Sequence, residues 1–131
     1  MKNIVEKLKS LEKKISSEKG SFLLFSLLLR EDASEVWDLV VSASWASKNK
    51  ASALQYISKQ LNKTLSPNQI LKLSRIVIIE PGDPALEAMH KVIKIEHGTA
   101  EFKNCNFFGL EIRHAFIITS NRRTSPNKGI E

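Results

Sequence analysis

The chain contains only one cysteine, Cys105, among its 131 residues. One cysteine excludes an intramolecular disulfide and any zinc site built on a CxxC pair, and it is typical of a reducing compartment. The strongest apolar run, residues 22–29, is far shorter than the roughly 20 residues that span a bilayer. A long charged segment precedes this run, which is not the pattern of a signal peptide. The sequence therefore predicts a cytoplasmic protein that does not enter a membrane.

Sequence motifs with a known chemistry are also scarce. Neither the Gly-rich Walker pattern nor the GxGxxG dinucleotide fingerprint occurs. The three histidines, His90, His97 and His114, are too scattered for a helical HExxH zinc site. Cys105 stands between two asparagines, with no cation beside it that would stabilise a thiolate. We therefore expect no cofactor and no metal site, and an enzyme is the less favoured interpretation.

Positive charge is concentrated at the two ends of the chain. Of a net charge of +6, residues 1–20 carry +3 and residues 121–131 carry +2, so the hundred residues between them are nearly neutral. A duplex-binding domain more often carries its charge on a folded face, because affinity grows with each phosphate that is neutralised. Nucleic-acid binding through the basic termini is therefore an alternative that is not favoured, and it predicts a steep salt dependence.

Hydrophobic periodicity predicts a helix and then a hairpin in the first third of the chain. Apolar residues at helical spacing, with Lys and Glu between them, indicate an amphipathic helix over residues 2–18. The run 22–30 is either a buried strand or, because it is rich in Leu, a helix, and we favour the strand. A tight connection leads to an antiparallel strand over 36–43. The consecutive apolar residues 39–41 indicate that this second strand is buried on both faces and central in the sheet.

The rest of the chain alternates helices and strands. In order, the predicted elements are a helix over 49–63, a short helix from Ser66-Pro67-Asn68-Gln69, a strand over 75–79, a helix from Pro84 to about His97, and strands over 99–104 and 110–119. Ser66 begins the short helix because its sequence is a capping box with Pro at the first helical position. The strand 75–79 is continuously apolar, which indicates that neighbours cover both of its faces.

These elements, in the order α-β-β-α-α-β-α-β-β, predict an α/β fold, with a mixed α+β class as the alternative. We expect one globular domain over residues 1–120, built on a mixed sheet of about five strands with helices on its faces. Residues 121–131 have almost nothing to bury and are predicted to form a flexible basic tail.

Two loops form the first candidate site. If strands 36–43 and 75–79 are parallel, both following loops emerge at one edge of the sheet, where open α/β sheets hold ligands. The first loop offers hydroxyls, an ammonium group and free N–H groups at a helix start, which together suit a phosphate. Its candidate residues are Ser42, Ser44, Trp45, Ser47 and Lys48. The structural alternative is that Ser47 or Asn49 caps the next helix and that Trp45 packs the loop down instead of stacking on a ligand.

The second loop contributes two carboxylates, Glu80 and Asp83. Carboxylates at such an edge bind a hard cation or act as acid and base. Asp83 precedes Pro84 and therefore also fits as the N-cap of a helix. A nucleotide- or metal-dependent enzyme that uses the crevice between loops 42–48 and 80–83 is the alternative function that these residues suggest.

A short motif gives this alternative a more specific form. The sequence Pro81-Gly82-Asp83, followed by Glu101-Phe102-Lys103, resembles the Asp…Glu-x-Lys pattern of metal-dependent nucleases of the restriction-endonuclease class. The resemblance implies that the carboxylates hold Mg²⁺ and that Lys103 helps to activate water. In those enzymes the acidic residue and the Glu-x-Lys lie on adjacent hairpin strands, whereas here a predicted helix separates them.

Two features favour a protein partner instead. The helix 2–18 is amphipathic, although its apolar stripe is narrow and also suits packing on the core. Phe107 and Phe108 are adjacent, so both cannot point to one side of a regular strand, and an exposed Phe often marks a partner surface. Our leading hypothesis is a small binding or accessory domain that acts through self-association as a homo-oligomer or through a protein partner.

Overall fold

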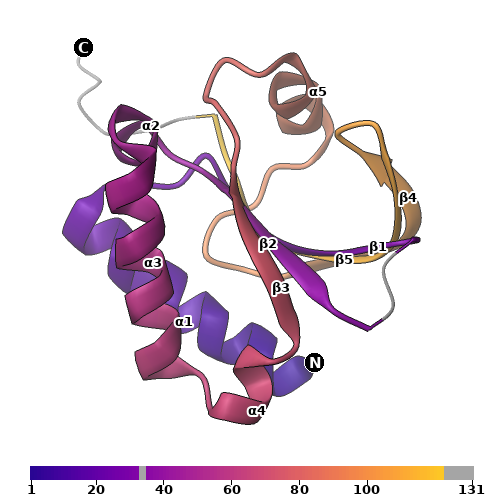
Figure 1. The fold of residues 1–131 in the computed structure, drawn as a ribbon. Helices are drawn as coiled ribbons and strands as arrows, with labels where there is room; N and C mark the ends of the chain where they lie inside the picture. Colours follow the sequence, from indigo (N-terminus) through magenta and orange to yellow (C-terminus); the bar gives the residue numbers. More distant parts are fainter. Residues whose placement is uncertain (33–34, 123–131) are drawn as a thin grey trace.

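The computed structural model describes residues 1–32 and 35–122, which form five helices and five strands (Figure 1). The helices are α1 (Lys2–Lys19), α2 (Ser44–Lys48), α3 (Lys50–Thr64), α4 (Pro67–Ile70) and α5 (Pro84–Val92). The strands are β1 (Leu24–Arg30), β2 (Trp37–Ser42), β3 (Leu73–Ile78), β4 (Ala100–Phe107) and β5 (Leu110–Ser120). This order confirms the predicted mixed fold, with α2 as an additional short helix where a loop is predicted.

One mixed sheet holds these strands in the order β3-β2-β1-β5-β4. β1 pairs antiparallel with β2 and β5, and β4 pairs antiparallel with β5. β2 and β3 are parallel, with Val41 opposite Ile78, because the chain between them crosses over through α2, α3 and α4. The predicted hairpin and the predicted parallel pair are both confirmed. β2 is buried at every position, as its continuous apolar run predicts.

Three helices cover one face of the sheet, and we call α1, α2 and α3 together the helical layer (Figure 1). Leu8 and Ile15 of α1 and Ile57 of α3 are fully buried against Phe25 and Leu27 of β1. The apolar stripe of α1 is therefore part of the core. Removing apolar area from water at these contacts is the main force that holds the helical layer on the sheet.

The other face of the sheet is covered by α5, and the hairpin of β4 and β5, which is part of the sheet, adds apolar side chains on this side. Leu86 and Met89 of α5 pack against Leu24 and Val40 in a second core cluster. Phe102 of the hairpin lies against the same cluster and is only partly buried. This cover is smaller than the helical layer, because α5 has nine residues whereas α1 and α3 have 18 and 15.

Strand β3 differs from its predicted environment. It pairs with β2 alone among the described strands and lies at an edge of the sheet. Its residues are half-buried or exposed. Its apolar side chains pack against the core clusters on both faces, so the predicted cover is present but incomplete. The free edge also leaves backbone groups without a neighbouring strand, which is the usual liability of an edge strand.

The segment after α5 also differs from prediction. α5 ends at Val92 rather than near His97, because the backbone of Ile95 exchanges two hydrogen bonds with Ser120 at the end of β5. β4 is longer than the predicted strand and continues to Phe107. A two-residue turn, in which Phe108 and Gly109 both have positive φ, then leads into β5.

No helix within residues 1–32 and 35–122 has both the length and the apolar character that a membrane span requires. The predicted flexible tail lies outside the described residues from residue 123 onward.

Candidate functional site

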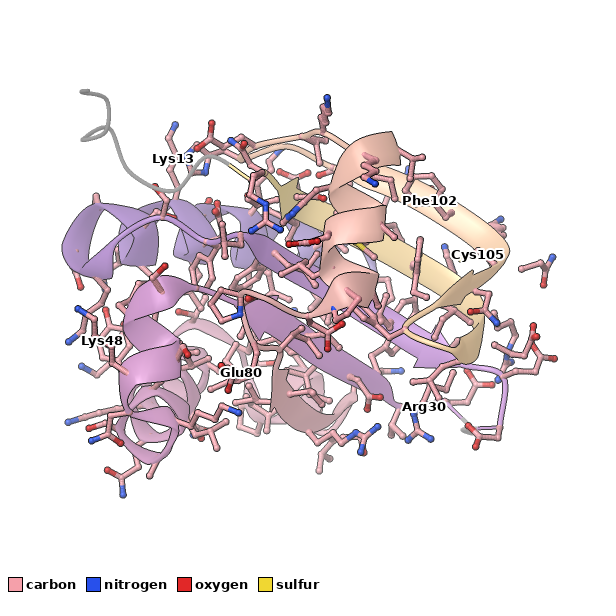
Figure 2. All side chains as sticks on the ribbon, turned by 90° about the horizontal axis from the view of Figure 1, so that it is seen from above. Lys13, Arg30, Lys48, Glu80, Phe102 and Cys105 are labelled. Atoms are coloured by element: carbon pink, nitrogen blue, oxygen red, sulfur yellow. The ribbon has the colours of Figure 1, made fainter. Side chains whose placement is uncertain are left out.

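The loops that follow β2 and β3 meet at one edge of the sheet, as the parallel pair predicts. Ser47 Oγ donates a hydrogen bond of 2.9 Å to Glu80 Oε1. Lys50 Nζ pairs with Glu80 Oε2 at 2.5 Å. Figure 2 shows Lys48 and Glu80 toward one end of the view, away from Cys105. The fold therefore brings together the serine-rich loop and the acidic loop.

Glu80 is the acceptor for the serine hydroxyl and the lysine ammonium at this edge. Hydrogen bonds from Lys50 and from Ser47 lower the pKa of its carboxyl below the usual range. Both carboxylate oxygens are engaged by these contacts, while Ser44 and Lys48 lie exposed on α2. None of the four main cavities in the described parts of the chain is lined by these residues. The arrangement resembles a closed ion pair more than an open phosphate site.

Ser42 and Trp45 face the interior of the protein. Ser42 is fully buried at the end of β2. Trp45 Nε1 donates a hydrogen bond of 3.0 Å to the carbonyl oxygen of Gly20, and its ring meets that of Phe22 edge to face at 5.7 Å between centroids. These contacts pack the loop onto the end of α1, which is the structural alternative for Trp45.

Asp83 has a capping role. Its Oδ1 accepts a hydrogen bond of 2.8 Å from the backbone N–H of Ala85, and Pro84 is the first helical residue of α5. Asn49 caps α3 in the same way, through a hydrogen bond of 3.1 Å from the N–H of Ser52. Each cap satisfies a backbone donor that the first turn of the helix leaves free.

The residues of the nuclease-like pattern do not come together. Asp83 follows β3, whereas Glu101 and Lys103 lie on β4, at the opposite edge of the sheet. Four strand spacings separate these edges, which is roughly 19 Å. Glu101 Oε2 is instead paired with His114 Nε2 at 2.6 Å. Within residues 1–32 and 35–122, no group of three or more His, Cys, Asp or Glu side chains is arranged to hold a metal ion.

The aromatic residues near the β4–β5 turn pack against the protein. Phe107 and Phe108 are half-buried against the core cluster under α5, and the Phe107 ring meets Phe102 edge to face at 6.0 Å. Cys105 lies in the same region, and burial raises the pKa of its thiol. A raised pKa disfavours the reactive thiolate.

A polar cluster around Glu12 was missed by the sequence prediction. Glu12 is fully buried, and its Oε1 lies 2.7 Å from His97 Nδ1. Its Oε2 accepts hydrogen bonds of 2.8 Å from Thr119 and 3.2 Å from Ser16. Because the hydroxyls and the imidazole contact the same carboxylate, this is not the hydroxyl–imidazole–carboxylate order of a catalytic triad. The cluster ties α1 to β5 and to the segment after α5.

A signal for this burial is present in the sequence. Glu12 lies four residues after Leu8 and three before Ile15, so it falls within the apolar stripe of the helix. A carboxylate in such a stripe is buried only when partners satisfy its oxygens. Those partners come from distant parts of the chain, which is why local sequence reasoning does not find them.

Among the four main cavities in the described residues, the one with the largest volume lies between α3 and the free edge of β3. It has a volume of about 740 Å³, and its wall is mainly apolar. The residues that line it are Leu54, Gln55, Ser58, Lys59, Leu61, Asn62, Ile70, Leu73, Ser74, Arg75 and Ile76. We call this cavity the α3–β3 groove. Lys59 and Arg75 are its charged residues, and no acidic residue lines it.

The backbone of β3 borders this groove. Ile79 N donates to Val41 O at 2.8 Å, which fixes the direction of the ladder between β2 and β3. Because successive residues of a strand direct their backbone groups alternately, Val77 faces β2, and Ile76 and Ile78 present N–H and C=O groups at the free edge.

No family model, curated protein or solved structure matches the chain.

Proposed function

We propose that this domain works by binding, and that the α3–β3 groove holds an extended, acidic segment of a partner protein. One observation carries the proposal: an unpaired strand edge lies beside an apolar wall whose charged residues are both basic. The leading sequence hypothesis of a binding or accessory domain is thereby kept. The proposed binding surface differs from the two partner surfaces predicted from the sequence. The apolar stripe of α1 and the rings of Phe107 and Phe108 pack on the core instead.

The free edge of β3 favours an extended ligand. Backbone groups of Ile76 and Ile78 at the edge would pair with an added strand, as in β-strand addition. Such pairing gives affinity independent of the partner's side chains. The adjacent apolar surface of Leu54 and Leu73 would then receive every second side chain of the added strand.

The charges of the groove select an acidic partner. Lys59 stands on the α3 side of the groove and Arg75 on the strand side, and the Arg75 side chain is half exposed. Arg75 also donates to the buried carboxylate of Asp38 at 3.3 Å, which fixes its position. Carboxylates between the apolar positions of the partner would complement these two cations.

The same charges disfavour a second copy of this chain as the occupant. A two-fold dimer is self-complementary, so pairing β3 with its own copy would bring each groove's cations toward those of the other. Like charges across an interface oppose association. We therefore propose a different protein as the partner, in contrast to self-association.

Panning a display library of random peptides against the immobilised protein tests the proposal. We expect enriched peptides to alternate apolar and acidic residues. A synthetic peptide of the enriched sequence, followed by fluorescence anisotropy, should bind the Leu54→Glu variant about tenfold more weakly, because the new carboxylate repels the ligand and replaces an apolar contact. Val92→Glu is the matched control, since Val92 is 78% exposed on α5, and it should bind like the wild type.

Three results would contradict the proposal. One is equal weakening by Leu54→Glu and Val92→Glu, because the groove would then have no special role. Another is a concentration-dependent dimer in sedimentation equilibrium that Leu54→Glu dissociates, which would make a second copy the occupant. Enrichment of basic peptides, or of peptides with helical spacing, would also exclude an acidic strand.

A further inference from the structure

The positive charge of this protein is carried by a folded face. The three helices of the helical layer contain ten Lys and three Glu, a net charge of +7. The rest of the described residues contain eight Lys or Arg and ten Asp or Glu, a net charge of −2. Counting along the chain hides this separation, because the basic α2 and α3 and the acidic loops are averaged together.

The arrangement of the side chains increases the charge of this surface. Glu12 is buried in its polar cluster and therefore does not offset any surface lysine. Glu18 accepts a hydrogen bond of 2.8 Å from Tyr56, and Glu6 pairs with Lys9 at 3.7 Å. The other lysines of the layer are exposed. The solvent-exposed surface of the helical layer therefore carries many ammonium groups.

A shallow hollow lies on this face, between α1 and the end of α3. Its volume is about 430 Å³. Lys7 and Lys14 of α1 line it together with the hydroxyl residues Ser10 and Thr64, and Glu6 and Leu11 complete the lining. Lys7 Nζ donates a hydrogen bond of 2.8 Å to Oε1 of Gln69 in α4. Lys14 Nζ donates a hydrogen bond of 3.3 Å to Oε1 of Gln60 in α3. These bonds hold the two ammonium groups across the seam between the helices.

We propose that this face binds the phosphate backbone of nucleic acid, independently of sequence. Ammonium and hydroxyl groups are donors that contact phosphates and position a protein on a nucleic acid. Binding of this kind is driven by release of counterions and needs no base contacts. The face offers Lys in place of the bidentate Arg that reads guanine. Its only tyrosine, Tyr56, is engaged by Glu18 and by Lys19, whose Nζ lies 4.8 Å from the ring centroid.

An anionic membrane is the less suitable ligand. A helix that binds a membrane surface inserts an apolar face beneath its lysines. Here the apolar stripe of α1 is buried on the sheet, and the large apolar side chain exposed within the described helical layer is Leu54, at 37%. Without an insertable face, attraction to lipid would be electrostatic only.

Fluorescence anisotropy of a labelled DNA duplex of about 20 base pairs tests this inference, with salt varied between about 0.05 and 0.2 M. We expect binding whose logarithm falls linearly with the logarithm of salt. The triple variant Lys7→Gln, Lys14→Gln and Lys63→Gln removes the two lysines of the hollow and the exposed Lys63 in the last turn of α3. It should weaken binding at least about tenfold and reduce the slope by about 3, because each phosphate contact contributes about 0.9.

Two variants with the same loss of charge serve as controls. Lys91→Gln, Lys94→Gln and Lys103→Gln removes three exposed lysines outside the helical layer, and Arg122→Gln, Arg123→Gln and Lys128→Gln removes the basic residues near the chain end. Both should reduce the slope by less than about 1. Circular dichroism of each variant establishes that it is folded. Leu54→Gln, which puts an uncharged amide into the apolar wall of the α3–β3 groove and leaves the charge of the helical layer unchanged, should keep duplex binding within about twofold, so that the two proposals are tested separately.

Three outcomes would overturn the inference. An equal loss of affinity in the three charge variants would mean that net charge alone attracts DNA. An unchanged salt slope in the Lys7, Lys14 and Lys63 variant would place the contacts elsewhere. Tighter binding to vesicles containing phosphatidylserine than to the duplex would make a membrane surface the ligand. Single-stranded DNA and duplex RNA, as further probes, should show the same dependence on these lysines.

Discussion

The two faces of the sheet differ in both packing and charge. The helical layer covers one face with a large apolar cluster and presents a basic surface, whereas α5 covers the other face with a smaller cluster. The α3–β3 groove lies at the margin between them, where the cover of the sheet stops at β3. Charge and exposure in this protein therefore follow the layers of the fold and not the order of the chain.

The largest effect should come from emptying the core under the helical layer. Leu8→Ala removes a fully buried side chain of α1, and we expect a loss of about 3 kcal/mol in the free energy of unfolding, measured by urea denaturation. If α1 were a detachable partner-binding helix, the loss would be below about 1 kcal/mol. Leu86→Ala on α5 is the comparison from the other face and should cost about 2 kcal/mol, because a smaller cover collapses more readily onto the space left.

Two carboxylate–imidazole pairs, one buried and one exposed, should differ in how much they stabilise the protein. The Glu12 carboxylate is fully buried beside His97, whereas that of Glu101 is 48% exposed beside His114. Glu12→Gln should cost about 2 kcal/mol of stability, because the amide cannot accept from every donor around it. Glu101→Gln should cost less than about 1 kcal/mol, since water replaces an exposed partner. Equal costs in thermal or urea unfolding would mean that the Glu12 cluster is not a structural tie.

The helix caps should have intermediate effects. Asn49→Ala at the start of α3 and Asp83→Ala at the start of α5 should each lower stability by about 1 kcal/mol, because each leaves a backbone N–H without its acceptor. Ser44→Ala is the control, since Ser44 makes no cap and is exposed, and it should change stability by less than about 0.5 kcal/mol. Unchanged stability after replacement of Asp83 would contradict its role as the cap of α5.

A further predicted effect appears only at alkaline pH and concerns Tyr56, the single tyrosine of the chain. Burial, together with the hydrogen bond to Glu18, raises the pKa of its phenol to about 12. The native protein thus retains this proton at pH values where the unfolded chain releases it, so stability should fall as pH rises from about 10 to about 12.

Absorbance of the phenolate, followed during alkaline titration, checks this prediction. The native midpoint should lie near 12. Glu18→Gln should lower it only partly, since burial is the larger cause. A native midpoint of about 10 would show that the contact between α1 and α3 leaves the phenol fully hydrated.

Local signals in the sequence were sufficient for much of the fold. The hairpin of β1 and β2, the parallel pairing of β2 with β3 and the capping box at Ser66 all follow from nearby residues, and the structure has each of them. The predicted meeting of the serine loop with Glu80 also holds, because parallel pairing determines where both loops emerge.

The remaining features depend on contacts between distant residues. The apolar run of β3 resembles that of β2, so sequence alone does not reveal that one is at the edge and the other is internal. α5 ends early because Ile95 pairs with Ser120, a residue of the last strand. The basic face was missed for the same reason: its lysines come from three helices, while the acidic residues that balance them lie elsewhere.

Amide hydrogen exchange along β3, measured with and without the enriched acidic peptide, tests the proposed function most directly. The account predicts that the edge-facing amides of Ile76 and Ile78 become protected when the peptide is bound, while Val77, already bonded to β2, changes little. Protection confined to other elements, or an equal change at all three amides, would contradict strand addition at this edge.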